Sequence, residues 1–362
     1  MENRRIRVGI THGDINGVGY EVILKTFADT TMAELCTPIV YGSPKVLAYH
    51  RKALESSTNF QTINVATDAV EGKLNLLSCT EEEIKIDFGK PTAESGKAAL
   101  LSLECAMKDY KEGLIDVLVT APINKNCIQS DVFRFSGHTE YIQACVGEGA
   151  EALMILMNEN LRVALVTTHL PLKDIPAAIT QEGIEAKLRI FLHTLKQDFT
   201  ISKPRIAVLA LNPHAGEEGL LGSEEKEIII PAMKAVDPEG TSCFGPFPAD
   251  GFFGSRTYEH FDGILAMYHD QGLAPFKTLA MEDGVNYTAG LSIVRTSPAH
   301  GTAYDIAGKG CADENSFRQA IYTAIDVYRS RQAYAEAHAC PLAKVYHERR
   351  DDSDKLKLNS ED

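Results

Sequence analysis

The chain has 362 residues, 44% of them hydrophobic and 24% charged, and its 36 basic against 50 acidic residues give a formal net charge of −14. This length exceeds one typical core, so two domains are expected. The acidic balance argues against DNA or RNA as a partner, because binding to a phosphate backbone depends on a basic surface that releases counterions.

The eight cysteines are scattered without a Cys-x-x-Cys pair, which argues against a disulfide framework or zinc ribbon and indicates reduced thiols. No apolar run approaches the roughly 18 residues that span a bilayer, and no signal peptide precedes the first strand. We therefore expect a cytoplasmic protein without a membrane partner.

The chain begins with a predicted strand over residues 6–11, a glycine-rich turn and a helix over 20–27. A strand, glycine loop and helix suggest dinucleotide binding, since helix N-termini attract phosphate. The turn glycines, Gly13, Gly17 and Gly19, lack the Gly-x-Gly-x-x-Gly spacing of the Rossmann fingerprint. The turn either faces a cleft as a tight connection or contacts phosphate directly.

Alternating elements continue through the first half. A strand is predicted over 38–41 and a helix over 44–54. Residues 55–91 follow as short alternating pieces, which we expect to form either an antiparallel edge or an excursion from the sheet. An amphipathic helix over 92–112 leads into a strand over 116–120.

The next segment, Gly-His-Thr-Glu at 137–140, precedes a predicted helix over 140–146. Thr139 either caps this helix or, together with His138, points from the helix N-terminus at a bound ligand. The local sequence leaves both interpretations open.

The second half repeats the pattern. Strands are predicted over 151–157 and 161–168, as an antiparallel hairpin, and over 205–211 and 264–267, with helices over 181–197, from about 223 and over 316–338. Residues 284–287 and 293–297 are short apolar pieces punctuated by polar groups. Gly272 and Pro275 predict that no regular element continues after the strand at 264–267. Asn315 is the expected cap of the last helix.

Three predicted strands end in a histidine, namely His169, His214 and His269. In open α/β sheets ligands bind beyond the carboxyl ends of the strands. Imidazole suits borderline divalent ions, and three protein ligands leave an open position for catalysis. A shared metal site is one interpretation, and satisfied loop histidines are the other.

Lys277 and Arg295 are cations in apolar or Gly/Pro-rich surroundings, where an unpaired charge is costly. An anion such as phosphate would pair them, with Asn286 adding a neutral hydrogen bond. The alternative is an internal ion pair with Asp250 or Asp270, which are themselves candidates for general acid/base catalysis or for orienting the histidines.

These residues lie in motifs that resemble the 4-hydroxythreonine-4-phosphate dehydrogenase family of vitamin B6 biosynthesis. The motifs are Asn-Pro-His-Ala-Gly-Glu at 212–217, Pro-Ala-Asp at 248–250, Leu-Ala-Met-Tyr-His-Asp-Gln-Gly at 265–272, Gly-Val-Asn at 284–286, Arg-Thr-Ser at 295–297 and His-Gly-Thr-Ala at 300–303. The chain departs from the family pattern in the turn at 13–21 and at Ser136, Gly251 and Ala299.

The resemblance implies a two-domain α/β fold like isocitrate and isopropylmalate dehydrogenases, with α/β/α layers, a mixed sheet, a cleft between the domains and no Rossmann motif. Residues 1–128 with 303–345 would form the first domain. Residues 129–302 would form the second, with the metal histidines and the dimer interface, and 346–362 a polar tail.

The resemblance also implies site residues. His169, His214 and His269 would bind the metal, with the third histidine, His269, contributed across the interface of a homodimer with a shared active site. The substrate-binding set implied by the family is His138, Thr139, Lys277, Asn286 and Arg295, with the phosphate on Lys277 and Arg295.

The implied reaction is oxidation of 4-phosphohydroxy-L-threonine by NAD or NADP, with a divalent metal (Zn, Co, Mg or Mn), and decarboxylation to 3-amino-2-oxopropyl phosphate. The cofactor residues stay open, and residues 300–310, from His300 to Gly310, are the candidate segment. Threonate or erythronate 4-phosphate is an alternative substrate. A metal-dependent hydrolase and a non-enzymatic phosphometabolite-binding protein are the remaining alternatives.

Overall fold

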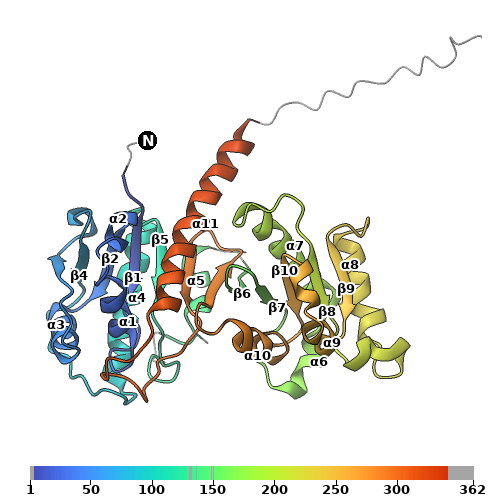
Figure 1. Ribbon diagram of the computed structural model, residues 1–362, viewed down its shortest axis with the longest axis horizontal. Helices are drawn as coiled ribbons and strands as arrows, with labels where there is room; N and C mark the ends of the chain where they lie inside the picture. The colour runs from blue at the N-terminus through green and yellow to red at the C-terminus, as the bar shows by residue number, and fades with distance from the viewer. Residues whose placement is uncertain (1–3, 130–132, 136, 148, 150, 341–362) are drawn as a thin grey trace, which may run out of the picture.

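The computed structural model describes residues 4–129, 133–135, 137–147, 149 and 151–340. The predicted polar tail, 346–362, and Ser136 lie outside these ranges. Within them the chain forms two α/β lobes, and a long helix lies over the middle of the molecule (Figure 1).

The described residues contain one mixed sheet of twelve strands in the order β3-β4-β2-β1-β5-β12-β11-β6-β7-β10-β8-β9. The strands are β1 (Arg7–Thr11), β2 (Thr37–Gly42), β3 (Phe60–Ile63), β4 (Leu74–Ser78), β5 (Val117–Thr120), β6 (Leu153–Met157), β7 (Arg162–Leu165), β8 (Ile206–Leu209), β9 (Cys243–Phe247), β10 (Gly263–Ala266), β11 (Val285–Ala289) and β12 (Val294–Pro298).

Helices connect these strands. They are α1 (Gly19–Thr26), α2 (Met32–Leu35), α3 (Pro44–Ala53), α4 (Ala93–Lys111), α5 (His138–Val146), α6 (Ile175–Ala178), α7 (Gln181–Gln197), α8 (Ile230–Val236), α9 (Ala249–Gly254), α10 (His269–Ala280) and α11 (Asn315–Ala339). Shorter helical turns are η1 (Ala66–Asp68), η2 (Leu172–Asp174), η3 (Pro213–Gly219), the π-helix η4 (Glu225–Ile229) and η5 (Thr257–His260).

Both ends of the sheet are parallel, and its centre is antiparallel. β1 pairs in parallel with β2 and β5, and β10 with β7 and β8. Between them, β11 runs antiparallel to β12 and β6. The long helix α11 packs against β5, β11 and β12, so it covers the junction of the two lobes (Figure 1).

β12 joins the lobes directly. It pairs in parallel with β5, and Arg295 lies opposite Leu118 in that ladder. One continuous sheet therefore crosses from the first lobe to the second. The α/β class with a mixed sheet is confirmed, and the division into two domains at the predicted boundaries stays a prediction.

Most predicted elements are present, and the hairpin of β6 and β7 is antiparallel as expected. The predicted antiparallel edge over 55–91 is wrong. β3 and β4 lie there as parallel edge strands, and residues 83–88 form no strand. Ile84, Ile86 and Phe88 instead pack as partly buried side chains against the core, which explains their alternation without a ladder.

The predicted stop after β10 is also wrong, because α10 runs through Gly272 and Pro275. A Cβ on Gly272 would lie 2.8 Å from Val163 Cγ1, so the glycine lets α10 pack closely on β7. Leu273 and Phe276 are buried along this contact, and burial of this apolar face outweighs the one hydrogen bond that Pro275 removes.

Two predicted caps differ from the structure. α5 begins at His138 with Gly137 at the N-cap, so Thr139 lies inside the first turn and does not cap it. α11 begins at Asn315, whose backbone N–H donates to the side chain of Asp313 at 2.7 Å. The capping residues predicted from the sequence therefore located the first residue of α5 and of α11 only to within one or two positions.

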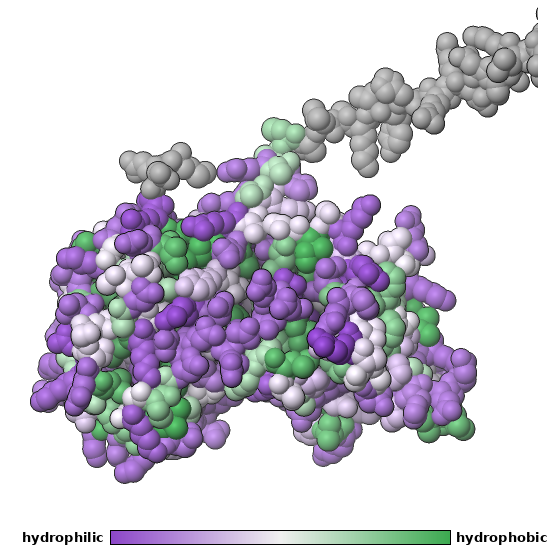
Figure 2. All heavy atoms as spheres, in the orientation of Figure 1, coloured by the Kyte–Doolittle hydropathy of each residue, from purple (hydrophilic) through white to green (hydrophobic). Residues whose placement is uncertain are grey.

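In the described part of the chain, no helix combines the length and apolarity needed to cross a bilayer. The face of the molecule in Figure 2 is mainly hydrophilic, with hydrophobic residues in separate small groups.

Candidate active site

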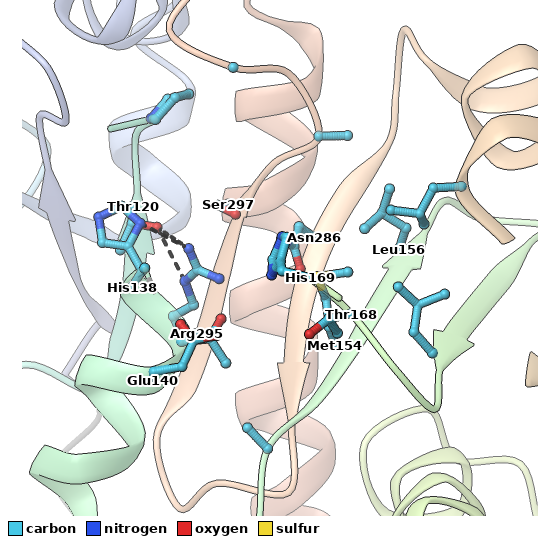
Figure 3. Close-up of a pocket in the computed structure, with 18 of the residues that line it drawn as sticks. Thr120, His138, Glu140, Met154, Leu156, Thr168, His169, Asn286, Arg295 and Ser297 are labelled. Atoms are coloured by element: carbon cyan, nitrogen blue, oxygen red, sulfur yellow. Dashed lines mark hydrogen bonds between the residues drawn. The ribbon is translucent and has the colours of Figure 1, made fainter. Parts of the chain in front are cut away.

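A cleft of about 350 Å³ opens between the lobes. Its walls come from the residues that follow β5, β7 and β10, from the first turn of α5, and from β11 and β12. Figure 3 shows labelled side chains from β5, α5, the exit of β7, β11 and β12 around one space. The cleft therefore gathers segments that lie more than a hundred residues apart in the sequence.

Arg295 lies on the wall of this cleft and is only 3% exposed. Its Nη2 and Nε donate to Thr120 Oγ1 at 2.7 and 3.2 Å (Figure 3). Its Nη1 donates to Thr288 Oγ1 at 3.2 Å. The ion pairs of the described residues do not include Arg295, so the predicted alternative of a pair with Asp250 or Asp270 does not form within the described chain.

This burial lowers the pKa of Arg295 to about 10, against the opposing effect of the Glu140 carboxylate. The guanidinium stays charged near neutral pH. A buried cation held by neutral hydroxyl groups is expensive without an anion. The geometry therefore suits an anionic ligand group.

His138, on the first turn of α5, lies beside Arg295. Arg295 Nη2 is 3.3 Å from His138 Nδ1. A guanidinium can only donate, so Nδ1 accepts and the ring proton lies on Nε2. Burial, followed by the positive charges of Arg295 and Lys125, holds the pKa of His138 well below its usual range. His138 is thus a neutral donor at physiological pH.

The other predicted substrate-binding residues, Thr139, Lys277 and Asn286, also line the cleft. Asn286 Oδ1 is buried without a hydrogen-bond partner among the described residues. An orphaned acceptor on a cleft wall indicates a place for a ligand donor. The structure thus brings together all five predicted substrate-binding residues.

Sequence reasoning missed several residues of the cleft. Thr120, Lys125 and Glu140 line it, and Glu140 is the one acid among the described lining residues. Lys125 follows the end of β5, a polar strand exit that was visible in the sequence but had no assigned role. Its Nζ lies 3.2 Å from His169 Nε2.

Two of the predicted metal histidines meet in the cleft. The rings of His169 and His269 lie with their centroids 5.7 Å apart. His269 Nδ1 is 2.7 Å from Asp270 Oδ1, and because a carboxylate accepts, Nδ1 carries the proton and Nε2 is free. This hydrogen bond suits the orienting role that was one of the two predicted for Asp270, and the role itself stays a prediction.

His214 and Asp250 lie outside the cleft walls, and both are exposed. His214 belongs to the turn η3 beyond β8, and Asp250 to α9. No group of three or more potential metal ligands forms within the described ranges of this single chain.

The paired histidines fit part of a metal site. Two imidazoles on one ion, with metal–nitrogen bonds of about 2.1 Å, place their ring centroids about 5 Å apart. The observed 5.7 Å is close to that spacing. Burial, followed by the charge of Lys125, lowers the pKa of His169, which favours the neutral ring that a metal needs.

The glycine-rich turn after β1 serves internal packing. Val18 N donates to Thr302 O at 3.1 Å, and a Cβ on Gly17 would lie 2.6 Å from the same oxygen. Asp14 is buried and accepts from Ser95 Oγ and Tyr304 Oη at 3.0 and 2.7 Å. The turn thus supports the start of residues 300–310, whose first members, His300 and Gly301, line the cleft.

With this geometry, the similarity to known proteins can be interpreted. Residues 34–324 match the family model described as pyridoxal phosphate biosynthetic protein PdxA. The chain belongs to the PdxA family.

Named members of the PdxA family resemble the whole chain. It is 66% identical, over 362 residues and 100% of both chains, to 4-hydroxythreonine-4-phosphate dehydrogenase of Bacteroides thetaiotaomicron. It is 41% identical to the enzyme of that name from Sulfurihydrogenibium sp., covering 90% of this chain and all of the relative. The resemblance inferred from the motifs is confirmed.

A solved PdxA-family structure supports the fold. The crystal structure of 4-hydroxythreonine-4-phosphate dehydrogenase from Klebsiella pneumoniae is 32% identical, with a TM-score of 0.77 over 90% of this chain and 99% of that one. Terephthalate 1,2-cis-dihydrodiol dehydrogenase from Burkholderia xenovorans shares the fold with a TM-score of 0.58 at 24% identity. The similar proteins with these names are dehydrogenases.

Proposed function

We propose that this PdxA-family chain oxidises 4-phosphohydroxy-L-threonine with NAD or NADP and releases 3-amino-2-oxopropyl phosphate for pyridoxal phosphate biosynthesis. The observation that carries this proposal is Arg295, a buried guanidinium on the cleft wall with hydroxyl and imidazole partners instead of a carboxylate. Membership of the PdxA family and the names of the relatives support the substrate.

The cleft residues suit a small molecule with two anionic ends. Arg295 and Lys277 would bind the phosphate, with Thr120 keeping the guanidinium in place. His138 would donate its Nε2 proton to the carboxylate or the hydroxyl of the substrate. Asn286 Oδ1 would accept from a substrate donor, such as the ammonium or hydroxyl group.

In the proposed reaction the C3–H bond breaks and its electron pair passes as hydride to the nicotinamide ring, while the C3 hydroxyl loses a proton. The resulting 3-keto acid breaks its C1–C2 bond, CO2 leaves, and C2 takes a proton. The residues of the cleft contribute by holding both ends of the substrate in one orientation.

We assign the divalent ion (Zn, Co, Mg or Mn) to His169, His214 and His269. When bound, it would act as a Lewis acid that polarises the C3 oxygen. Asp270 would keep His269 in the tautomer with a free Nε2. The ammonium group of Lys125 donates to His169 Nε2 in the structure, so Lys125 would have to move away before this nitrogen could bind the metal.

We further propose a homodimer with a shared active site. His169 and His269 lie together in one chain, so the histidine that crosses the interface would be His214 of the partner subunit, in place of the expected His269. The turn that carries His214 ends in two exposed leucines, Leu220 (77%) and Leu221 (42%). Leu172, close after His169, is 73% exposed. Exposed apolar side chains on the turn of His214 and shortly after His169 support a surface that a partner subunit covers.

The nicotinamide cofactor would supply the hydride acceptor. Residues 300–310 are the proposed contact, since His300 lines the cleft and its Nε2 is buried without a partner in the described chain. Asp250 could reach the cleft only from a partner subunit. We place the reaction in the cytoplasm, where nicotinamide cofactors and reduced thiols coexist.

An absorbance assay of the reduced cofactor tests this function. Purified protein would be mixed with 4-phosphohydroxy-L-threonine, NAD+ or NADP+, and Zn, Co, Mg or Mn. We expect metal-dependent reduction of the cofactor. Faster turnover of threonate 4-phosphate or erythronate 4-phosphate would show that this related acid, and not 4-phosphohydroxy-L-threonine, is the substrate. Absence of reduction with every metal and substrate would reject the dehydrogenase proposal and leave hydrolysis or ligand binding alone.

A further inference from the structure

We propose that Glu225 is a positioning residue, which holds the turn that carries His214 and thereby sets the affinity of the metal site. This inference rests on the proposed function, because it takes His214 as a metal ligand. Glu225 is the first residue of the π-helix η4, and it follows the turn η3 (Pro213–Gly219), which carries His214, closely in the sequence. π-helical turns occur frequently at functional sites.

The carboxylate of Glu225 is buried against the exit of β8. The side chain is 3% exposed, and its Oε1 accepts from the backbone N–H groups of Leu211 and Asn212 at 2.9 and 2.8 Å. Its Oε2 accepts from Asn212 Nδ2 at 3.1 Å. The ion pairs of the described residues do not include Glu225. Backbone donors and one amide thus compensate the buried charge.

The turn held in this way has an unusual backbone. His214, Ala215, Gly216, Glu217 and Glu218 all have positive φ, between 42° and 76°. Left-handed conformations cost L-residues roughly 1–2 kcal/mol each, so the surrounding contacts must stabilise this turn. Strain of this kind is typical of segments that present a functional side chain.

Gly216 is the point where the turn meets the carboxylate. A Cβ there would lie 2.5 Å from Glu225 Oε2 and 2.9 Å from Gly222 O. Leu221 N also donates to Gly216 O at 3.0 Å, which closes the loop. Glu225 therefore contacts the segment on both sides of His214, through Asn212 before it and Gly216 after it.

The surface contacts of the turn are weaker. Lys226 Nζ lies 2.9 Å from Glu218 Oε2, but Glu218 is 93% exposed. Such exposed pairs contribute little to stability. The buried carboxylate of Glu225 is consequently the contact whose loss would change the presentation of His214.

The test is cobalt(II) titration of the full-length protein, followed by visible absorbance. Glu225→Gln keeps the size of the side chain but replaces one accepting oxygen by an NH2 group, which would face N–H groups that also donate. Gly216→Ala adds a Cβ close to Glu225 Oε2 and so disturbs the contact between the turn and the carboxylate. Glu224→Gln is the matched control, since Glu224 also accepts from Asn212 Nδ2, at 2.7 Å, without reaching the backbone of the strand exit. Gly219→Ala is the control for Gly216→Ala, because Gly219 also has a positive φ but a Cβ there would meet no other atom.

We expect Glu225→Gln and Gly216→Ala to weaken cobalt binding at least about tenfold, as for other residues that orient metal ligands. Both variants should also unfold at a lower temperature than the wild type, because buried donors lose their acceptor or the turn is strained, so cobalt binding is compared at a temperature where all variants are folded. Each control should bind cobalt like the wild type. If Glu225→Gln bound cobalt as tightly as the wild type while His214→Ala lost binding, the role of Glu225 would be overturned and the metal assignment would stand. Absence of cobalt binding in the wild type would overturn the metal assignment itself.

Discussion

Arg295 Nη2 lies 3.3 Å from Nδ1 of His138, so the buried guanidinium meets a neutral imidazole where an internal carboxylate would normally be expected. The two residues come from β12 and α5, which lie in different parts of the chain. Their contact leaves the positive charge available to a ligand.

Replacement of this cation should separate binding from stability. Arg295→Met should raise KM for 4-phosphohydroxy-L-threonine at least about tenfold, because charge-assisted hydrogen bonds contribute about 1.5–3 kcal/mol. The same variant should raise the melting temperature of the ligand-free protein, since a buried unpaired charge is removed. Steady-state kinetics and calorimetry measure the two effects. Lys196→Met, at an exposed position on α7, is the control, and an unchanged KM in Arg295→Met would contradict the anion site.

Asn286 allows a similar separation. Its Oδ1 is buried without a partner in the described chain, so Asn286→Leu should leave the stability of the ligand-free protein unchanged or higher. KM should rise about tenfold through the loss of one ligand hydrogen bond. A lower melting temperature with a normal KM would show that Asn286 serves the fold instead of the substrate.

Asp270 should control metal affinity through His269. Asp270→Asn removes the carboxylate that lies 2.7 Å from His269 Nδ1, and we expect zinc affinity to fall about 10–100-fold in competition with a chelator. Asp283→Asn is a matched control, because Asp283 accepts from Asn158 away from the cleft. Equal zinc affinity in the two variants would exclude the orienting role.

The stability of the protein should fall in mild acid because of two buried histidines. Burial lowers the pKa of His12 and of His50 to about 4. Both pKa values lie below the unfolded value of 6.5, so the unfolded chain binds protons first, and stability present above pH 6.5 is lost as the pH falls towards 4. Each histidine should contribute a loss of about 2 kcal/mol between pH 7 and pH 5.

Urea unfolding of wild type and His50→Phe at these two pH values measures this contribution. The variant keeps an aromatic ring against Phe88 but cannot titrate. Its stability should therefore depend less on pH than that of the wild type, by about 2 kcal/mol over this interval. Parallel curves for the two proteins would show that His50 is already protonated or exposed.

Periodicity and turn residues predicted most strands and helices, because each element has an apolar face of its own. The prediction of an antiparallel edge was wrong because the direction of β3 and β4 depends on the strands with which they pair, and the local alternation of residues does not reveal it. The stop at Gly272 failed because a glycine can also mark close packing of a helix on a strand.

The five residues proposed to bind the substrate were predicted as a set because the motif resemblance locates each of them, and the structure places all five on the wall of one cleft. Local sequence offered no means to place Arg295 beside Thr120, a contact that depends on the pairing of β12 with β5. The pairing of His169 with His269, and the separate position of His214, likewise depend on the order of β7, β10 and β8 in the sheet.

The central claim is that each active site uses His169 and His269 of one chain and His214 of its partner. Subunit mixing tests it, with differently tagged variants co-expressed and the heterodimers isolated. His214→Ala paired with His169→Ala should recover one intact site, with both cobalt binding and turnover, whereas His169→Ala paired with His269→Ala should recover none. Recovery in the second pair and not in the first would contradict the claim, because His269 would then be the ligand that crosses the interface.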